Sequence, residues 1–246
     1  MTRLLAVLML SLAAGKAFDG TAEIQPSARE ILNQVLSNRP LKDFSLKGRL
    51  FVNREDELPV EIFVRNSPNE TCTIFQATNT HLLVVQPLQG NPRLYLRGTG
   101  ELVGTQRMGR LLGSSFSYYD LAAPYLHWSN AVLVGEERIR AQNCFVINST
   151  ATGEPYARVK LWIHKEYSAL LRAEAYDAND NLIRRFAITS FKKIGDVWVP
   201  RGMEMSFVPA GQALPSQEKS RLQIDEGDYD AHLPVDLFLP EKFGAR

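Results

Sequence analysis

The sequence lacks a charge imbalance and, past its beginning, any long apolar run. It has 28 Lys and Arg against 27 Asp and Glu. This near balance excludes recruitment of nucleic acid or an anionic membrane by bulk charge. After residue 17, no stretch approaches the roughly 20 apolar residues that a membrane helix needs. We therefore expect no nucleic-acid partner and no integral span in the chain that remains after its leader is removed.

Spacings that carry metal or catalytic chemistry are also missing. The four histidines have neither the i, i+4 nor the paired spacing of a metal site: His81, His127, His164 and His232. The segment GSSFS at 113–117 lacks the closing glycine of a nucleophile elbow. We predict no enzyme activity, no cofactor and no bound metal. A hydrolase that uses Ser115 or Ser117 with His127 is the catalytic alternative.

Two further segments resemble ligand loops without matching them. GTGELVG at 98–104 has the wrong glycine spacing for a dinucleotide loop and no βαβ unit around it, so we expect a turn. DEGDYD at 225–230 misses the oxygen-ligand spacing of a calcium loop, and we expect a solvated turn there.

The sequence contains two cysteines, Cys72 and Cys144. An oxidising compartment would let them pair if their Cα atoms came within about 7 Å. Each lies in an apolar, β-branched setting, TCTIF and NCFVI, which favours two buried thiols. Whether they form a disulfide stays open at this point.

The amino terminus has the pattern of a secretory signal peptide. Thr2 and Arg3 precede an apolar run over residues 4–14, and Gly15-Lys16-Ala17 offers a small-x-small cleavage site. The run is too short to span a bilayer, although an uncleaved anchor is the alternative. We expect a signal peptide over 1–17 and one exported domain over 18–246.

Hydrophobic periodicity predicts a mainly β protein with one leading helix. Ser27 and Glu30 form a capping box before an apolar stripe, which predicts a helix over 27–38. The period then changes to two, and about eleven strands follow. Twelve segments show strand signals: 44–52, 59–65, 71–77, 81–86, 93–97, 131–134, 138–148, 157–164, 170–176, 182–193, 197–208 and 220–224. Short connections favour one large antiparallel sheet, which will curl.

Residues 107–126, RMGRLLGSSFSYYDLAAPYL, are apolar but do not fit a strand. Ser117 and Asp120 form a second capping box, and Gly109 and Gly113 separate the apolar residues. We predict two short helices that lie as a lid across the concave face of the sheet. The alternative is that these side chains only complete the core.

Several segments together resemble the outer-membrane lipoprotein-sorting family, the Lol-type periplasmic carriers, and in particular its lipoprotein-sorting-like branch. They are RMGRLLGSSFSYYDL, GEERIRAQNCFVINS, PYARVKLWIHKEYSALLRAEAYDANDNLIRRF and GDVWVPRGMEM. The resemblance covers residues 41–240. Two acidic positions of the family pattern are occupied here by Ser115 and Tyr119. VRNSPNETCTIF resembles the region in which these carriers place a lid-holding arginine, and Arg65 is the matching position.

The resemblance implies an unclosed half-barrel with a helical lid over a hydrophobic cavity that binds acyl chains of a lipid or lipoprotein. It implies a periplasmic location, a role in outer-membrane lipoprotein sorting, and a membrane-bound donor or acceptor protein as partner. A periplasmic sensor module of the same fold, binding a membrane anti-sigma factor or a lipoprotein signal, is the alternative.

The cavity-lining residues are expected on one face of the first strands and on the inner side of the lid. We predict Phe44, Leu46, Leu50, Val52, Ile62, Val64, Met108, Leu111, Leu112, Phe116 and Leu121. A one-residue slip in strand register would invert this set.

Overall fold

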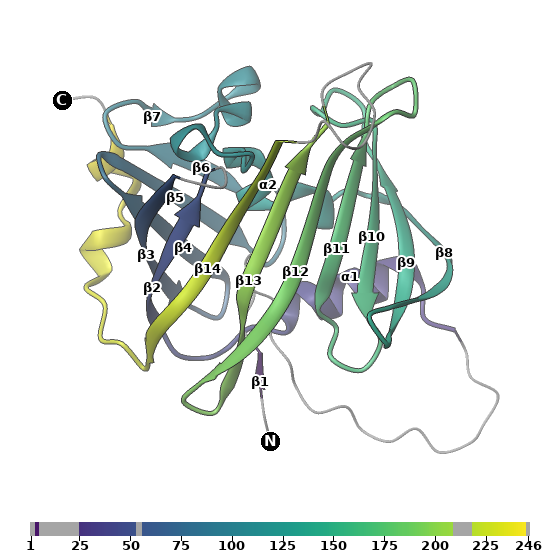
Figure 1. Cartoon of the computed structure of the whole chain (residues 1–246), viewed down its shortest axis with the longest axis horizontal. Helices are drawn as coiled ribbons and strands as arrows, with labels where there is room; N and C mark the ends of the chain where they lie inside the picture. The colour runs from purple at the N-terminus through teal and green to yellow at the C-terminus, as the bar shows by residue number, and fades with distance from the viewer. Residues whose placement is uncertain (1–2, 5–24, 53–55, 209–217, 245–246) are drawn as a thin grey trace.

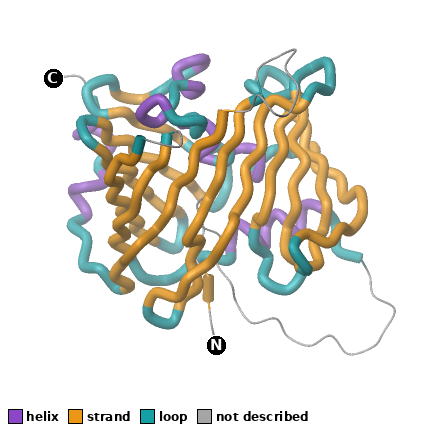
Figure 2. Tube along the Cα trace, viewed as in Figure 1, coloured by secondary structure: helices purple, strands orange, loops and turns teal. Residues whose placement is uncertain are grey.

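One long antiparallel sheet forms the body of the protein and curls without closing. The computed structural model describes residues 3–4, 25–52, 56–208 and 218–244. Thirteen strands follow one path in the order β7-β6-β5-β4-β3-β2-β14-β13-β12-β11-β10-β9-β8. Within the described residues, the end strands β7 and β8 do not pair with each other. The predicted unclosed half-barrel is thereby confirmed (Figures 1 and 2).

The strands are joined mostly by tight turns, as the short connections predicted. They are β2 Phe44–Phe51, β3 Glu57–Asn66, β4 Glu70–Ala77, β5 Thr80–Pro87, β6 Arg93–Leu96, β7 Gly100–Glu101, β8 Asn130–Ile139, β9 Gln142–Thr150, β10 Arg158–His164, β11 Leu170–Tyr176, β12 Leu182–Ile194, β13 Val197–Phe207 and β14 Glu218–Tyr229.

Two sequence expectations about strand bounds were wrong. The strand expected over 138–148 is a hairpin, because Arg140 and Ala141 adopt φ angles of 46° and 67° and turn the chain between β8 and β9. The acidic segment expected as a turn at 225–230 is largely strand. It continues β14, which pairs with β13 over residues 218–223 and with β2 over residues 221–229.

The leading helix α1, Ala28–Ser37, is confirmed together with its capping box. The Ser27 hydroxyl accepts a hydrogen bond from the Glu30 amide at 3.2 Å, and the Glu30 carboxylate accepts one from the Ser27 amide at 2.8 Å. Its buried stripe of Ile31, Leu32 and Val35 joins the main core. In Figure 1, α1 lies behind the sheet, toward the β8 end.

The main core fills the concave side of the sheet. Alternation along β2 buries Phe44, Leu46, Gly48 and Leu50, while Ser45, Lys47, Arg49 and Phe51 are partly or fully exposed. The same core takes in residues from β3, β5, β10, β12, β13 and β14. Each fully buried side chain of this size stabilises the fold by about 1.5–3 kcal/mol.

A chain of short helical pieces over residues 104–126, here called the lid, crosses this concave side. It consists of η1 Gly104–Met108, η2 Leu111–Gly113, α2 Tyr118–Ala122 and η3 Pro124–Leu126. Helix α2 contacts β5 and β6 near one end of the sheet. The predicted helical character of this segment and the capping box of Ser117 and Asp120 are confirmed.

Two smaller apolar clusters lie on the convex side. The C-terminal segments η5 Val235–Phe238 and η6 Pro240–Phe243 pack there over β4, β5 and β6, in a cluster that contains Cys72. Cys144 belongs to a separate cluster. Both thiols are buried and free, so the two cysteines do not form a disulfide.

The expected signal peptide lies outside the described residues except for Arg3–Leu4. These two residues form β1, which pairs in parallel with Val197 and Trp198 of β13. Among the helices of the described ranges, none is long and apolar enough to cross a membrane.

Candidate functional site

The eleven predicted cavity-lining residues lie together on the concave side. Eight are buried in one cluster: Phe44, Leu46, Leu50, Ile62, Val64, Leu111, Phe116 and Leu121. The other three, Val52, Met108 and Leu112, are partly buried and pack against it. The lid and the sheet therefore share one continuous apolar interface. A role of these residues in binding a ligand stays a prediction.

Asp120 is the polar centre of the lid and is 2% exposed. As the third residue of α2, its amide donates to the Ser117 hydroxyl at 3.0 Å, and its carboxylate accepts from that hydroxyl at 2.5 Å. The Tyr156 hydroxyl donates to the other carboxylate oxygen at 2.6 Å. Burial and the Asp120 charge raise the pKa of Tyr156 well above its usual value, so Tyr156 acts as a donor.

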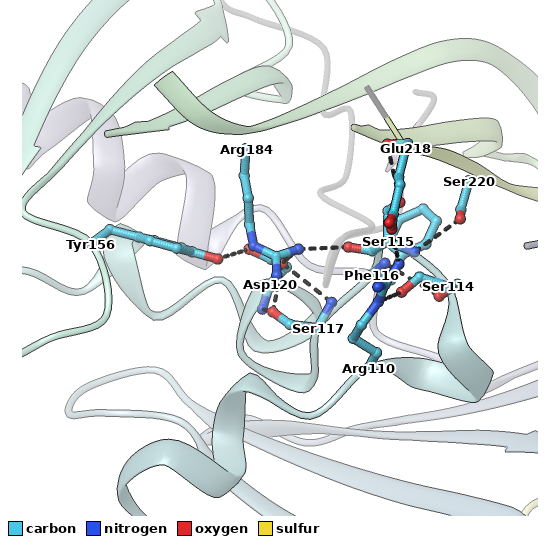
Figure 3. Close-up of polar contacts among 10 residues, drawn as sticks. All are labelled: Arg110, Ser114, Ser115, Phe116, Ser117, Asp120, Tyr156, Arg184, Glu218 and Ser220. Atoms are coloured by element: carbon cyan, nitrogen blue, oxygen red, sulfur yellow. Dashed lines mark hydrogen bonds and ion pairs between the residues drawn. The ribbon is translucent and has the colours of Figure 1, made fainter. Parts of the chain in front are cut away.

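Arg184 of β12 holds the lid from the opposite part of the sheet (Figure 3). Its guanidinium lies 3.2 Å from the Asp120 carboxylate and donates to the Ser115 carbonyl at 2.7 Å. Arg184 is 8% exposed and stacks over the Phe207 ring at 5.0 Å. Because charge-assisted hydrogen bonds are strong and directional, this arginine fixes both the helix and the strand-like segment before it. We call Arg184, Asp120, Ser117 and Tyr156 the latch.

A second set of contacts ties the lid to β14. The Ser115 amide donates to the Ser220 hydroxyl at 2.9 Å, and the Ser220 hydroxyl donates to the Val52 carbonyl at 2.6 Å. Arg110 donates to the Ser114 carbonyl at 2.6 Å and pairs with the carboxylate of Glu218. The contacts of Ser115 with Ser220 and of Arg110 with Ser114 and Glu218 are drawn beside the latch in Figure 3.

Glu154, in the loop between β9 and β10, supplies a second carboxylate to the lid. It accepts a hydrogen bond from the Tyr119 hydroxyl at 2.8 Å and forms an ion pair with Arg107 at 3.2 Å. Burial is the main cause that raises the pKa of Tyr119, and the hydrogen bond to the Glu154 carboxylate raises it further.

The lid backbone carries strain at two positions. Leu112 and Ala123 adopt left-handed conformations, with φ angles of 50° and 44°. Such conformations cost a non-glycine residue about 1–2 kcal/mol. Gly113 also has a positive φ of 75°, whereas Gly109 is needed for space, since a Cβ there would lie 2.7 Å from the Tyr118 ring. The observed conformation of the lid is therefore held by its contacts against the backbone preference of Leu112 and Ala123.

The structure corrects the predicted lid-holding role of Arg65. Its strand neighbour Val64 points to the concave core, so Arg65 points to the convex side. Its register partner is Cys72, which packs with the C-terminal segments on that side. The arginine that contacts the lid is Arg184, on a strand far from Arg65 in the sheet.

The serines of the hydrolase alternative serve as lid contacts. The Ser117 hydroxyl donates to Asp120, and the Ser115 hydroxyl donates to the Glu218 carbonyl at 3.2 Å. The Nε2 atom of His127 is buried and has no hydrogen-bond partner among the described residues. No described serine is therefore activated by His127. Groups of three or more metal-ligating side chains are also absent from the described residues.

Sequence reasoning identified Ser117 and Asp120 but missed Arg184, Tyr156 and Glu154. The capping box is a local pattern, whereas the three other side chains reach the lid from distant strands and loops. No spacing in the sequence indicates these contacts. Arg184 lies in the segment RRF, in which two adjacent arginines point to opposite faces of β12.

A family model described as an uncharacterized protein matches residues 76–244. The fold also has relatives among solved structures. An outer membrane lipoprotein-sorting protein domain from Vibrio parahaemolyticus has a TM-score of 0.73 at 15% identity, covering 87% of this chain and 97% of that chain. A DUF1329 family protein from Desulfovibrio piger has a TM-score of 0.70 at 16% identity, covering 88% and 97%.

A LolA superfamily protein from Nitrosomonas europaea has a TM-score of 0.59 at 20% identity, covering 87% of this chain and 98% of that chain. Among curated proteins, none matches the sequence. At these identities the likeness concerns the fold, and at that level it confirms the resemblance to lipoprotein-sorting proteins.

Proposed function

Because this chain belongs to the family of uncharacterized proteins whose model spans residues 76–244, and because it has the fold of lipoprotein-sorting proteins, we propose that it is a carrier of acyl chains. In this proposal the chain works in the periplasm and shelters the acyl chains of a lipid or lipoprotein beneath the lid. Its task is a step in outer-membrane lipoprotein sorting, between a membrane-bound donor and an acceptor.

The observation that carries the proposal is the shared apolar interface between the lid and the concave face. Leu111, Phe116 and Leu121 of the lid pack on the same cluster as Leu46 and Ile62 of the sheet. An acyl chain exposed to water costs about 0.8 kcal/mol per methylene group. Residues that bury one another when the lid is closed would bury such a chain when the lid is displaced.

The latch supports a lid that opens as a unit. The hydrogen bonds and the ion pair of the latch hold Asp120 in α2 and the carbonyl of Ser115 just before it. The left-handed residues Leu112 and Ala123 lie on either side of this segment. Release of the latch would relax both strained positions at the same time. A ligand that packs on the displaced lid would then shift the population toward the open form by its differential affinity.

Mass spectrometry of organic extracts from natively purified protein tests the proposal, together with titration by a fluorescent fatty acid. We expect co-purifying lipid and saturable binding that unlabelled lipid displaces. A Leu121→Asp variant places a charge on the inner side of the lid and is expected to lose binding. Val132→Asp changes an apolar residue that is 62% exposed on β8 and serves as the matched control. If the purified chain contained no lipid and bound no fluorescent fatty acid, the carrier function would be contradicted. If it then retained one partner protein in stoichiometric amount, that result would indicate a sensor module.

A further inference from the structure

Buried polar atoms without a partner mark a second feature on the concave side. They are Thr73 Oγ1, His127 Nε2 and Trp128 Nε1, none of which has a hydrogen-bond partner among the described residues. Thr73 is 1% and Trp128 is 6% exposed. Buried polar side chains are nearly always paired in native proteins, because a lost hydrogen bond is costly there. Three such atoms therefore need an explanation.

These atoms lie at the border of the main apolar core. Thr73 of β4 is the register partner of both Val64 and Val84, which belong to that core. His127 and Trp128 follow η3 at the end of the lid, and the Trp128 ring packs edge-on against Tyr125 at 6.4 Å. The polar atoms thus adjoin the residues proposed to shelter an acyl chain.

Two guanidinium groups add positive charge to the same region. Arg29 of α1 donates to the Trp128 carbonyl, and Arg39 donates to the Thr71 hydroxyl at 3.2 Å and to the Pro68 carbonyl at 3.4 Å. Neither forms an ion pair with a carboxylate of the described residues, although Glu70 exerts an electrostatic influence on Arg39. Thr71, the neighbour of Arg39, is fully buried on the concave face beside Gln86, which binds the end of α2.

The charges of both arginines reach His127. Burial is the main cause that lowers the pKa of His127 to about 4, and the positive charges of Arg29 and Arg39 contribute to the same shift. His127 is therefore neutral near pH 7 and can donate through one ring nitrogen. Trp128 Nε1 is a donor only, and the Thr73 hydroxyl can also donate. The region therefore combines hydrogen-bond donors with positive charge, and no described carboxylate pairs with Arg29. Such an environment suits a negatively charged oxygen.

We infer that Arg39, Thr73, His127 and Trp128, with Arg29 behind them, form a subsite for the ionised carboxylate of a long-chain fatty acid. The inference rests on the proposed carrier function and deepens it by naming the ligand class. The acyl chain lies on the concave apolar core, and the carboxylate accepts hydrogen bonds from the hydroxyl, the indole and the guanidinium. An ester-linked chain or an alcohol of the same length brings no charge to this region.

Competition titrations of the full chain at pH 7.5 test this subsite with palmitic acid, hexadecanol and hexadecyl phosphate. We expect the acid to bind at least tenfold more tightly than the alcohol. Thr73→Val keeps the side-chain shape and removes the hydroxyl, and Arg39→Gln removes the charge. Each is expected to reduce the preference for acid over alcohol by severalfold while leaving the affinity for the alcohol unchanged. Arg65→Gln, on the convex side, is the matched control and should keep the preference.

The outcomes separate the subsite from the carrier function. Equal binding of acid and alcohol by the unaltered chain would overturn the subsite and leave the carrier function standing. Binding of neither would overturn the carrier function itself. A preference for hexadecyl phosphate over palmitic acid, lost in Arg39→Gln, would overturn the assignment to a carboxylate. A full preference for acid in both folded variants, checked by thermal unfolding, would also overturn the subsite.

Discussion

Arg184 and Asp120 form a buried ion pair at 3.2 Å that joins strand β12 to the lid helix α2. Asp120 also accepts hydrogen bonds from the Ser117 hydroxyl of its own helix cap and from the Tyr156 hydroxyl, so both of its carboxylate oxygens have partners. A buried charge with several directed partners specifies one arrangement, because every displaced geometry leaves some group unpaired. This pair decides where the lid rests on the sheet.

Removal of the Arg184 charge should release the lid. In Arg184→Met, Asp120 keeps its burial but loses its cation, which lowers the free energy of unfolding by about 3–5 kcal/mol if the lid cannot open locally. If the lid opens instead, amide hydrogen exchange should accelerate across residues 107–126. Both are measured on the same sample by chemical denaturation and exchange mass spectrometry.

Arg185→Met is the control for that variant. Arg185 is the next residue on β12 but points to the other face, where it pairs with Glu174 and is partly exposed. A smaller loss than in Arg184→Met is expected there, because Arg185 is partly exposed and Glu174 keeps the hydrogen bond from the Tyr176 hydroxyl. Equal effects of the two variants on the lid amides would contradict the latch.

A covalent lock on the lid should block ligand uptake. The Ser115 amide and the Ser220 hydroxyl are 2.9 Å apart, and both residues are buried. A Ser115→Cys, Ser220→Cys double variant places two thiols at this contact between the lid and β14, and intact-mass measurement shows whether they cross-link. We expect the oxidised form to lose binding of a fluorescent fatty acid and the reduced form to regain it. Full binding by a protein shown by mass spectrometry to be cross-linked would exclude lid movement as the entry step.

Both native thiols should resist modification. Burial raises the pKa of Cys72 to about 12 and that of Cys144 to about 11. Since the thiolate is the reactive form, iodoacetamide at pH 8 should leave both unmodified in the folded protein. In denaturant, intact-mass measurement should show two adducts. Rapid native modification of either thiol would contradict the packing of its cluster.

Acid should destabilise the fold through His127. Its pKa is lowered to about 4 in the folded chain, against an ordinary value of 6.5, so the unfolded chain binds more protons between these pH values. The stability is fully present above pH 6.5 and is lost as the pH falls toward 4, by up to about 3 kcal/mol. His81 and His164 shift in the same direction and add to the slope.

A His127→Phe variant removes the contribution of His127 to the pH dependence of stability. Denaturation midpoints between pH 4 and pH 7 should vary less in this variant than in the unaltered chain. The matched control is His232→Phe, at an exposed position near the C-terminus, which should keep the original slope. Parallel slopes for all three proteins would refute the contribution of His127.

The parts of this fold that depend on short-range patterns could be predicted from the sequence. Both capping boxes, at Ser27 and Ser117, involve residues three positions apart, and the alternation along β2 shows which face is buried. The β8–β9 turn was missed because Arg140 and Ala141 are not typical left-handed residues. The acidic end of β14 was missed because its pairing partner, β2, lies far away in the sequence.

The candidate site likewise has one part that short-range patterns predict and one part that they do not. Its apolar half follows from periodicity, and the eleven predicted residues lie together. Its polar half depends on which strands the topology brings beside the lid, so the expected arginine was placed at Arg65 on β3, whereas Arg184 on β12 makes the contact. A motif comparison transfers a residue type, but it cannot transfer a position across a sheet of thirteen strands.

The contact between β12 and the lid depends on the register of two adjacent arginines, Arg184 and Arg185. Arg184 faces inward and Arg185 outward only because successive side chains alternate along a strand. Gain or loss of one residue in the preceding turn, Asp177 to Asn181, that shifted the strand by one position would turn Arg184 away from the lid. A shift in one direction would bring Arg185 into the place of Arg184 and keep a cation beside Asp120, whereas a shift in the other direction would put Ile183 there and remove that cation.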